Sequence, residues 1–535
     1  MFKILASVLI IAFFALMIAI GVISRKRARD VNGFVLGGRS VGPWLTAFAY
    51  GTSYFSAVIF IGYAGQFGWK FGISSTWIGL GNAFIGSLLA WVVLGRRTRV
   101  MTQHLDSKTM PDFFRKRFDS SALKVAASVI VFVFLIPYTA SLYNGLSSLF
   151  DMAFGLPYWV CIIVMAALTC AYVLIGGYMA TAINDFIQGI IMLVGIIAVV
   201  AAVIHTNGGF TEAVNSLAHV SAAEEGINQP GVFASFFGAD PAFLFFVIIL
   251  TSLGTWGLPQ MVGKFYAIKS EDSIKKGTII STVFAIIVAG GSYFLGGFGR
   301  LYSGADGVKA SDGSVAYDNI IPSMLKSLMG SVWGDIIIAI VIVLVLAASM
   351  STLSSLVLTS SSTLALDVID RKNNRGEKKN LRAMRLLVVF FVAVSAVIAI
   401  LKDANPTFTF IAQMMGVSWG ALAGAFLAPF MYGLYWKKTT NGSVWASFVW
   451  GVGITTVQLL QSFKLINLSS VPFLGYIFQN SIISGVAAMT GGLVIVPLFS
   501  LFTKKPDKNK VEEKFKCYDK KVYVTVKDSL EEKVK

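Results

Sequence analysis

The sequence predicts an all-α polytopic membrane protein with about thirteen transmembrane helices, since roughly 20 apolar residues cross a bilayer. Hydrophobic residues make up 56% of the 535-residue chain and charged residues only 13%. A soluble globular protein carries roughly 25% charged residues, so this composition does not supply a water-facing surface. The apolar residues also fall in long runs separated by short polar segments, which is the pattern of repeated membrane spans.

We expect the spans, in chain order, at 3–24, 43–67, 74–95, 123–150, 157–176, 180–204, 240–265, 277–300, 331–366, 384–401, 407–434, 443–463 and 476–502. The first run is longer than the apolar region of a signal peptide and its basic flank follows it, so we interpret it as a retained span. An odd number of spans places the two termini on opposite sides of the bilayer.

The basic residues predict the orientation. The chain carries 44 Lys and Arg against 27 Asp and Glu, a net charge of +17. If the N-terminus is outside the cell, 37 of the 44 lie on the cytoplasmic side or at the cytoplasmic ends of spans, as the positive-inside rule requires. The exceptions are Lys3, Lys70, Arg300, Lys309, Lys326, Lys402 and Lys464. We therefore expect a cell-membrane protein with a cytoplasmic C-terminus, and neither a nucleic-acid partner nor an obligatory protein partner.

Two of the expected spans contain helix-breaking residues. The second has the small and polar stretch 51–57, and the seventh has 254–260 with Pro259 between glycines. Proline removes a backbone donor and clashes with the preceding turn, so each stretch predicts an unwound segment. The two spans are five apart and enter the membrane from opposite sides, which predicts an inverted repeat of two five-helix units. Helix packing through small residues is the alternative explanation.

These features divide the chain into a transmembrane domain at 1–502, with core repeats near 43–204 and 240–434, and a basic cytoplasmic tail at 503–535. The tail mixes Lys, Glu and Val and is expected to lack a core of its own.

The ninth span ends in a cluster of hydroxyl side chains. Ten of the fifteen residues from Ser349 to Thr363 are Ser or Thr. Ser351, Ser354 and Ser355 share one helix face because they are spaced i, i+3 and i+4. Hydroxyl and unwound carbonyl oxygens suit a hard monovalent cation, so this face predicts a sodium site.

Asp185 lies inside the sixth span. An acid in a membrane helix is costly and is a candidate functional residue. We expect no basic residue in the spans near it, so the predicted partner of the carboxylate is a bound cation. An acid near a helix N-terminus and a proton site are the alternatives. Asp335 and Asp367 lie nearer span ends, where an ordinary structural role is expected.

Other classes of function have little support. The histidines at 104, 205 and 219 are all expected in loops, and the cysteines at 161, 170 and 517 have no metal-site spacing. We therefore do not expect an enzyme. The tail is too short for a signalling domain, which argues against a sensor.

At these residues the chain resembles the sodium/solute symporter family, and its pattern is closest to pantothenate-type and proline-type carriers. The resemblance rests on 55–57 with Gly62, on 176–177 followed by 184–189, and on 350–355. It implies a LeuT-type fold with three helices beyond the five-plus-five repeat, and symport of a small organic solute by alternating access.

The resemblance also implies sodium ligands. The first site would use oxygens of Thr52, Phe55, Ala348, Ser351 and Thr352. A second site, found in some members, would use Asp185, Ser354 and Ser355.

The solute is less clearly indicated. The candidate binding residues are Tyr54, Ser56, Tyr138, Trp256 and Gln260. Tyr54 and Val58 replace an aspartate and a tryptophan of proline-type members, which argues against simple proline transport. The stretches 37–62, 182–209 and 256–277 resemble pantothenate-type carriers more closely, and helix N-termini at the breaks favour a carboxylate, so we expect pantothenate or another organic anion. Sodium/proline, sodium/sugar and proton-coupled carriers remained as alternatives.

Overall fold

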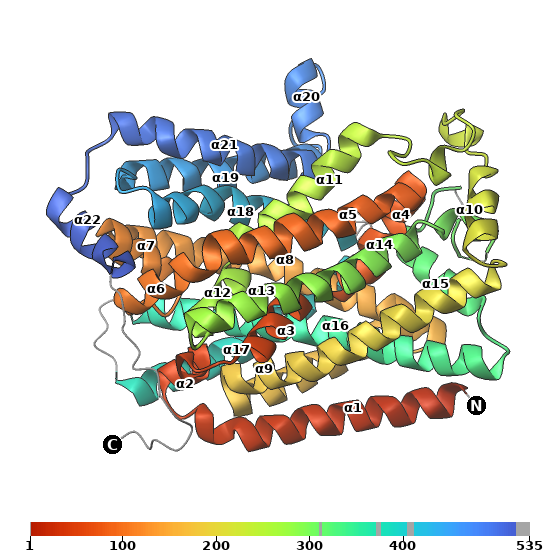
Figure 1. Ribbon diagram of the computed structural model, residues 1–535, viewed down its shortest axis with the longest axis horizontal. Coiled ribbons are helices and arrows are strands. Elements are labelled where there is room, and N and C mark those ends of the chain that lie inside the picture. The colour runs from red at the N-terminus through yellow and green to blue at the C-terminus, as the bar shows by residue number, and fades with distance from the viewer. Residues whose placement is uncertain (1, 306, 310–312, 371–375, 404–410, 520–535) are drawn as a thin grey trace, which may run out of the picture.

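The computed structural model describes residues 2–305, 307–309, 313–370, 376–403 and 411–519. Over these ranges the chain is helical, and its β structure is limited to isolated bridges. The long helices run side by side along the long axis of the molecule (Figure 1). The all-α polytopic fold class is confirmed.

The helices of the first half are α1 (Phe2–Ser24), α2 (Val31–Leu36), α3 (Pro43–Tyr54), α4 (Ala64–Phe71), α5 (Thr76–Gly81), α6 (Arg96–His104), α7 (Met110–Phe118), α8 (Ser121–Phe154), α9 (Tyr158–Thr206), α10 (Phe210–Ala218), α11 (Pro241–Leu253) and α12 (Pro259–Ala267). Those of the second half are α13 (Glu271–Ala285), α14 (Gly291–Gly296), α15 (Ile320–Lys326), α16 (Val332–Thr363), α17 (Glu377–Asp403), α18 (Ile411–Tyr435), α19 (Asn441–Ser462), α20 (Pro472–Phe478), α21 (Ser481–Phe502) and α22 (Lys508–Phe515).

Ten helical stretches in the described ranges are long and apolar enough to cross a membrane, and the bent pair α11 and α12 makes an eleventh. Two of the ten are interrupted by glycines with positive φ. Gly72 (φ 65°) divides the stretch Val58–His104, and Gly177 (φ 54°) divides α9. Dividing both stretches at these glycines gives thirteen segments, which agree with the predicted spans.

Both predicted helix breaks are present. α3 ends at Tyr54, Phe55 has extended backbone (φ −97°, ψ 92°), and a π-helical turn begins at Val58. α11 ends at Leu253, a tight turn follows, and α12 begins at Pro259 with its axis bent by 48°. Backbone polar groups at such breaks need partners, so the breaks mark where a ligand can be held.

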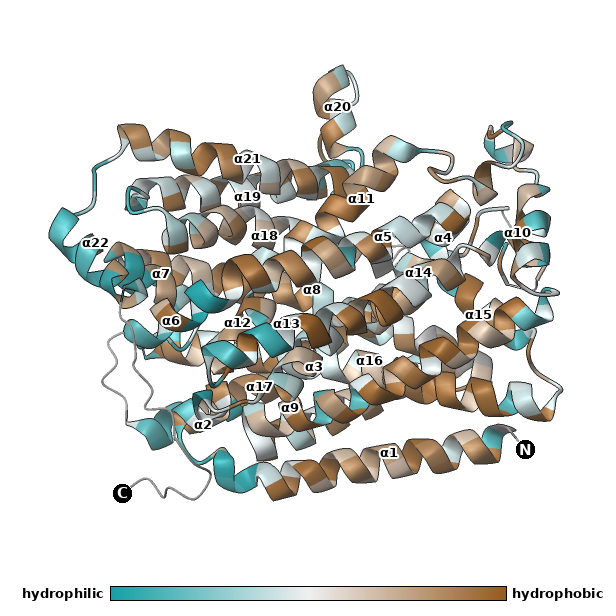
Figure 2. Ribbon diagram, viewed as in Figure 1, coloured by the Kyte–Doolittle hydropathy of each residue, from teal (hydrophilic) through white to brown (hydrophobic). Residues whose placement is uncertain are grey.

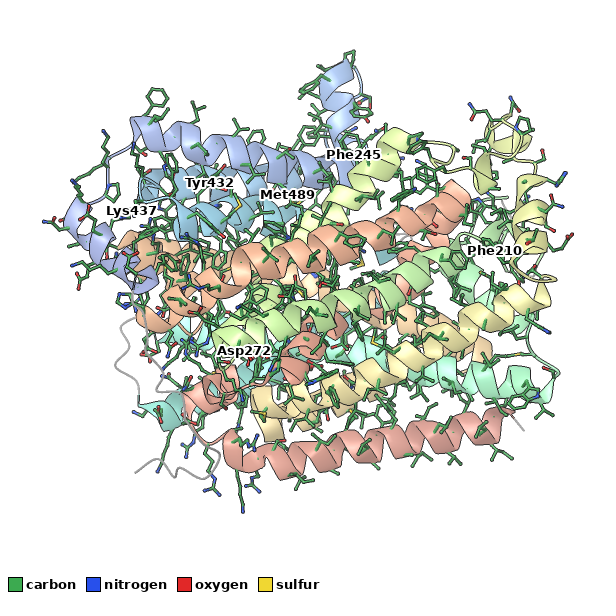
Figure 3. The ribbon with its side chains drawn as sticks, in the orientation of Figure 1. Phe210, Phe245, Asp272, Tyr432, Lys437 and Met489 are labelled. Carbon is green, nitrogen blue, oxygen red and sulfur yellow. The ribbon has the colours of Figure 1, made fainter. Side chains whose placement is uncertain are left out.

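α16 lies at the centre of the bundle, where 83% of its most apolar 18-residue stretch is buried. The corresponding share for α1, at the periphery, is 28%. It packs against α9, α8 and α3. Apolar side chains such as Phe245 of α11, which is 59% exposed, project from the outer helices (Figure 3). Hydrophilic residues gather at the two ends of the bundle (Figure 2), which is the distribution a bilayer requires.

The helices with Lys- and Arg-rich sequence, α6, α7 and α22, lie together at one end, which we call the basic end. α1 starts at the opposite end (Figure 1). The start of α1 and the C-terminal α22 are therefore at opposite ends of the molecule, as an odd number of spans predicts.

The beginning of the C-terminal tail packs onto the basic end. Lys514 Nζ lies 2.9 Å from Asp119 Oδ2, and the Tyr518 hydroxyl donates to the Arg97 carbonyl at 3.2 Å. The Arg117 guanidinium lies 5.0 Å from the centre of the Phe515 ring, and burial lowers its pKa to about 10, so it remains charged at neutral pH. The first residues of the tail therefore share a core with α6 and α7.

Candidate functional site

The break in α3 lies against the hydroxyl face of α16. Ser351 Oγ lies 3.1 Å from the Thr52 carbonyl oxygen and 3.2 Å from that of Ala348. Thr352 Oγ1 is 3.2 Å from each of the same two oxygens. The structure thus brings together four of the five residues predicted for the first sodium site, and Phe55, the fifth, is the residue at the break itself.

The local sequence explains this junction. Because α3 ends at Tyr54, the Thr52 carbonyl accepts hydrogen bonds from side chains of another helix. Ser351 and Thr352 also bond back to Ala348, one turn earlier in their own helix. A hydroxyl hydrogen can rotate away so that the oxygen lone pairs face a cation. The junction therefore offers neutral oxygens, which suit a monovalent rather than a divalent ion.

Asp185 has a basic neighbour, so the expectation that none lies near it is wrong. Lys264 Nζ of α12 is 3.5 Å from Asp185 Oδ2, and the two side chains are 4% and 0% exposed. The same ammonium donates to Ser355 Oγ at 2.9 Å. Ser355 Oγ lies 2.8 Å from Ser53 Oγ, so a polar chain joins α9, α12, α16 and α3.

Only two of the three residues predicted for a second sodium site thus lie around one point. Asp185 and Ser355 both contact Lys264, whereas Ser354 Oγ donates to the Ser351 carbonyl of its own helix at 2.9 Å. The carboxylate oxygens of Asp185 accept no hydrogen bond from the described residues.

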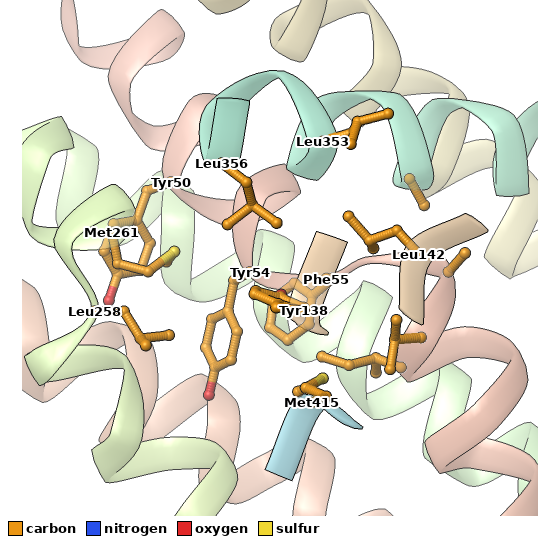
Figure 4. Packing of buried hydrophobic residues seen from close by; sticks show 14 of the residues in the cluster. Tyr50, Tyr54, Phe55, Tyr138, Leu142, Leu258, Met261, Leu353, Leu356 and Met415 are labelled. Atoms are coloured by element: carbon orange, nitrogen blue, oxygen red, sulfur yellow. The ribbon is translucent and has the colours of Figure 1, made fainter. Parts of the chain in front are cut away.

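The predicted solute residues surround the two helix breaks. Tyr54 stacks on Phe55 with ring centres 4.3 Å apart, and Tyr138 lies beside them (Figure 4). Both tyrosines pack against Trp419 of α18, each with ring centres 6.1 Å apart. Sequence reasoning missed Trp419. A tryptophan flanked by Ser418 and Gly420 inside an apolar span was the available signal.

Several buried polar atoms here have no hydrogen-bond partner among the described residues. They are Ser56 Oγ, the Tyr138 hydroxyl, both amide atoms of Gln260 and the Trp419 indole nitrogen. Leaving such an atom unpaired costs about 1–3 kcal/mol, so these atoms are available to bind water or a polar ligand. Tyr54 and Trp256 differ, because they donate to the carbonyls of Thr251 (2.5 Å) and Ile85 (3.1 Å).

A cavity lies beside this region. Gln260, Lys264 and Ser355 line it, together with Lys108 and Thr109 of the segment before α7. Of the ion pair, Lys264 therefore borders a cavity that reaches toward the basic end.

The fold and these junctions define a polytopic transporter that holds ligands at paired helix breaks. Residues 34–451 match the sodium:solute symporter family, and the chain belongs to this family. It is a multi-pass membrane transporter that couples solute uptake to sodium.

Two relatives illustrate the similarity. The chain is 30% identical over 522 residues to the sodium/proline symporter of Staphylococcus aureus (strain JH9), covering 95% of each chain. It is 29% identical over 508 residues to the osmoregulated proline transporter OpuE of Bacillus subtilis (strain 168), covering 93% of this chain and 94% of the other.

Solved structures share the fold. A Na⁺-coupled sialic acid symporter superposes with a TM-score of 0.73 at 16% identity, covering 94% of this chain and 98% of that one. MhsT in complex with L-phenylalanine superposes with a TM-score of 0.50 at 13% identity, covering 86% and 98%. The expected LeuT-type fold is confirmed.

Proposed function

We propose that the protein takes up a small carboxylate-bearing solute, with proline the first candidate, together with sodium held between α3 and α16. The observation that carries the proposal is the junction at which the Ser351 and Thr352 hydroxyls meet the carbonyls of Thr52 and Ala348 within 3.2 Å. Phe55 supplies the fifth oxygen. Binding of sodium would fix the two helices against each other, which links the ion to the arrangement of the bundle.

The solute would bind beside the breaks, against the rings of Tyr54, Tyr138 and Trp419. The unpaired polar atoms of Ser56 and Gln260 would contact its polar groups. The names of the relatives support an amino acid of the size of proline. Tyr54 and Val58 depart from the proline-type pattern, so pantothenate belongs in the same test.

The orientation is also part of this proposal. We place the basic end in the cytoplasm and the start of α1 outside the cell membrane. Cys517 is buried against the basic end and would report poorly. Labelling would instead use Lys3→Cys and Lys505→Cys, one at a time, in a protein without its native cysteines. Both positions are exposed. In intact cells an impermeant thiol reagent should label only the first, and labelling of both would contradict the proposed topology.

The test of function is uptake into proteoliposomes with sodium and proton gradients imposed separately. Labelled proline, pantothenate and a sugar would be compared. We expect accumulation of one of the two carboxylates under a sodium gradient alone. Accumulation driven only by a proton gradient, or of the sugar alone, would contradict the proposal.

A further inference from the structure

We infer that the ammonium of Lys264 is a built-in cation that takes the position of a second sodium, so that the protein binds a single sodium ion. The inference rests on the proposed sodium site between α3 and α16. It concerns a second position one helical turn further along α16, at Ser355. It opposes the hypothesis of a second sodium held by Asp185, Ser354 and Ser355.

The first support is the contact geometry. Lys264 Nζ contacts Asp185 Oδ2 at 3.5 Å and Ser355 Oγ at 2.9 Å, which are an acid and a hydroxyl of the predicted second ligand set. It also lies 5.5 Å from the ring centre of Tyr178, on the same helix as Asp185. A lysine ammonium and a sodium ion carry the same charge and both bind oxygen atoms. Lys264 therefore makes the contacts that a sodium ion would make.

The second support is the charge balance. Asp185 and Lys264 are 0% and 4% exposed, and together they are neutral. A sodium ion added to Asp185 would leave one uncompensated positive charge in a buried region. Two cations sharing one carboxylate also repel each other strongly where water is excluded. Lysine and sodium are thus alternatives at this position.

The third support is the link to the first sodium site. Ser355, which accepts from Lys264, lies 2.8 Å from Ser53, and Ser53 adjoins Thr52. Lys264 also follows Gln260 by four residues on α12, so the two side chains line one face and one cavity. The Lys264 ammonium therefore contacts α16 directly and is linked through Ser355 to α3, the two helices of the proposed sodium site.

A different role for Lys264 would be to bind the carboxylate of the solute. Its pairing with Asp185 argues against this role, because the ammonium is already neutralised. The two roles predict different results in the experiment below.

The test is equilibrium binding of radioactive sodium to the purified full-length protein, without any solute. We expect one sodium per chain in the wild type. Lys264→Gln should raise the number to two, because Asp185 would then need a cation. The double variant Lys264→Gln with Asp185→Asn should return it to one. Lys514→Gln is the control and should leave the number at one, because its partner Asp119 is 57% exposed and water can replace the lost ammonium.

Each outcome decides the matter. Two sodium ions on the wild type, or one on folded Lys264→Gln, would overturn the inference. An unchanged number with a large rise in the KM for the transported solute would assign Lys264 to the solute instead. If Lys264→Gln cannot be purified, the wild type still tests the inference, because two sodium ions on it would overturn it. Absence of sodium binding to the wild type would instead refute the proposed sodium site itself.

Discussion

Two buried lysine–aspartate pairs among the described residues differ in how fully they are coordinated. Lys124 Nζ lies 3.3 Å from Asp367 Oδ1 near the basic end, with side chains 4% and 1% exposed. Asp367 Oδ2 accepts from Thr109 at 2.6 Å, and Lys124 also donates to the Leu366 carbonyl at 3.1 Å. The pair of Asp185 and Lys264 is equally buried, but no described residue donates a hydrogen bond to Asp185 within ordinary geometry.

The pair at the basic end joins the segment before α7 to α8 and to the helical turn that follows α16, and both carboxylate oxygens have partners. The carboxylate of the central pair accepts no hydrogen bond from the described residues. Because buried polar groups are costly when unpaired, we expect the central pair to have a functional role and the other pair a structural one. Four predictions test this comparison.

The largest effect is expected from Asp185→Asn, which leaves the Lys264 ammonium buried without a counter-charge. Breaking a buried pair on one side costs about 3–5 kcal/mol. The free energy of unfolding in detergent, measured by denaturant titration, should fall by about this amount. Adding Lys264→Gln should restore most of it. A double variant no more stable than the single one would show that the two side chains are not coupled.

A smaller loss is expected from Asp367→Asn. The amide still accepts from Thr109, and Lys124 keeps its bond to the Leu366 carbonyl. We expect a loss of about 1–3 kcal/mol in the free energy of unfolding. The sodium concentration for half-maximal uptake should not change. A shift in that concentration would give the pair at the basic end a part in coupling, against the comparison drawn here.

The double variant Ser351→Ala with Thr352→Ala should weaken sodium binding. Two lost ligands at about 1 kcal/mol each raise the sodium concentration for half-maximal uptake tenfold or more. Ser361→Ala with Ser362→Ala is the matched control, since both hydroxyls bond to the Leu358 carbonyl of their own helix. Equal shifts in the two variants would refute the assignment.

The smallest effect is expected from Lys514→Ala in the tail. Its partner Asp119 is 57% exposed, and exposed pairs contribute about 0–1 kcal/mol. The change in the free energy of unfolding should stay within that range and should shrink further at high salt. A loss comparable to that of Asp367→Asn would mean that exposure is a poor guide to the strength of these pairs.

The sequence predicted the features that have local signals. Apolar runs marked the spans, and Pro259 and the stretch 51–57 marked the breaks. Helical spacing placed Ser351, Ser354 and Ser355 on one face, and the resemblance to the symporter family paired that face with the break in α3. Lys264 was missed because it lies near the end of its apolar run and was counted with the basic residues at helix ends. The helix restarts at Pro259, however, so Lys264 belongs to its second turn and is buried. Its spacing of four from Gln260 was the signal that could have found it.

The docking of the tail onto the basic end was not predictable in the same way. Phe515 and Tyr518 are two aromatic residues in a charged segment, and their partners come from α6 and α7. Such a contact depends on how distant elements meet, which no local pattern encodes.

If Lys264 takes the place of a second sodium, its charge would also limit how steep a concentration difference the protein can sustain. Each sodium that crosses 100 mV contributes about 2.3 kcal/mol, which corresponds to roughly 50-fold accumulation of a neutral solute. Two sodium ions would raise this electrical ceiling to about 2,000-fold. A cation fixed to the chain returns with the empty carrier and adds nothing to the driving force. With a single mobile ion, the carrier would sustain only the smaller of these two accumulation ratios.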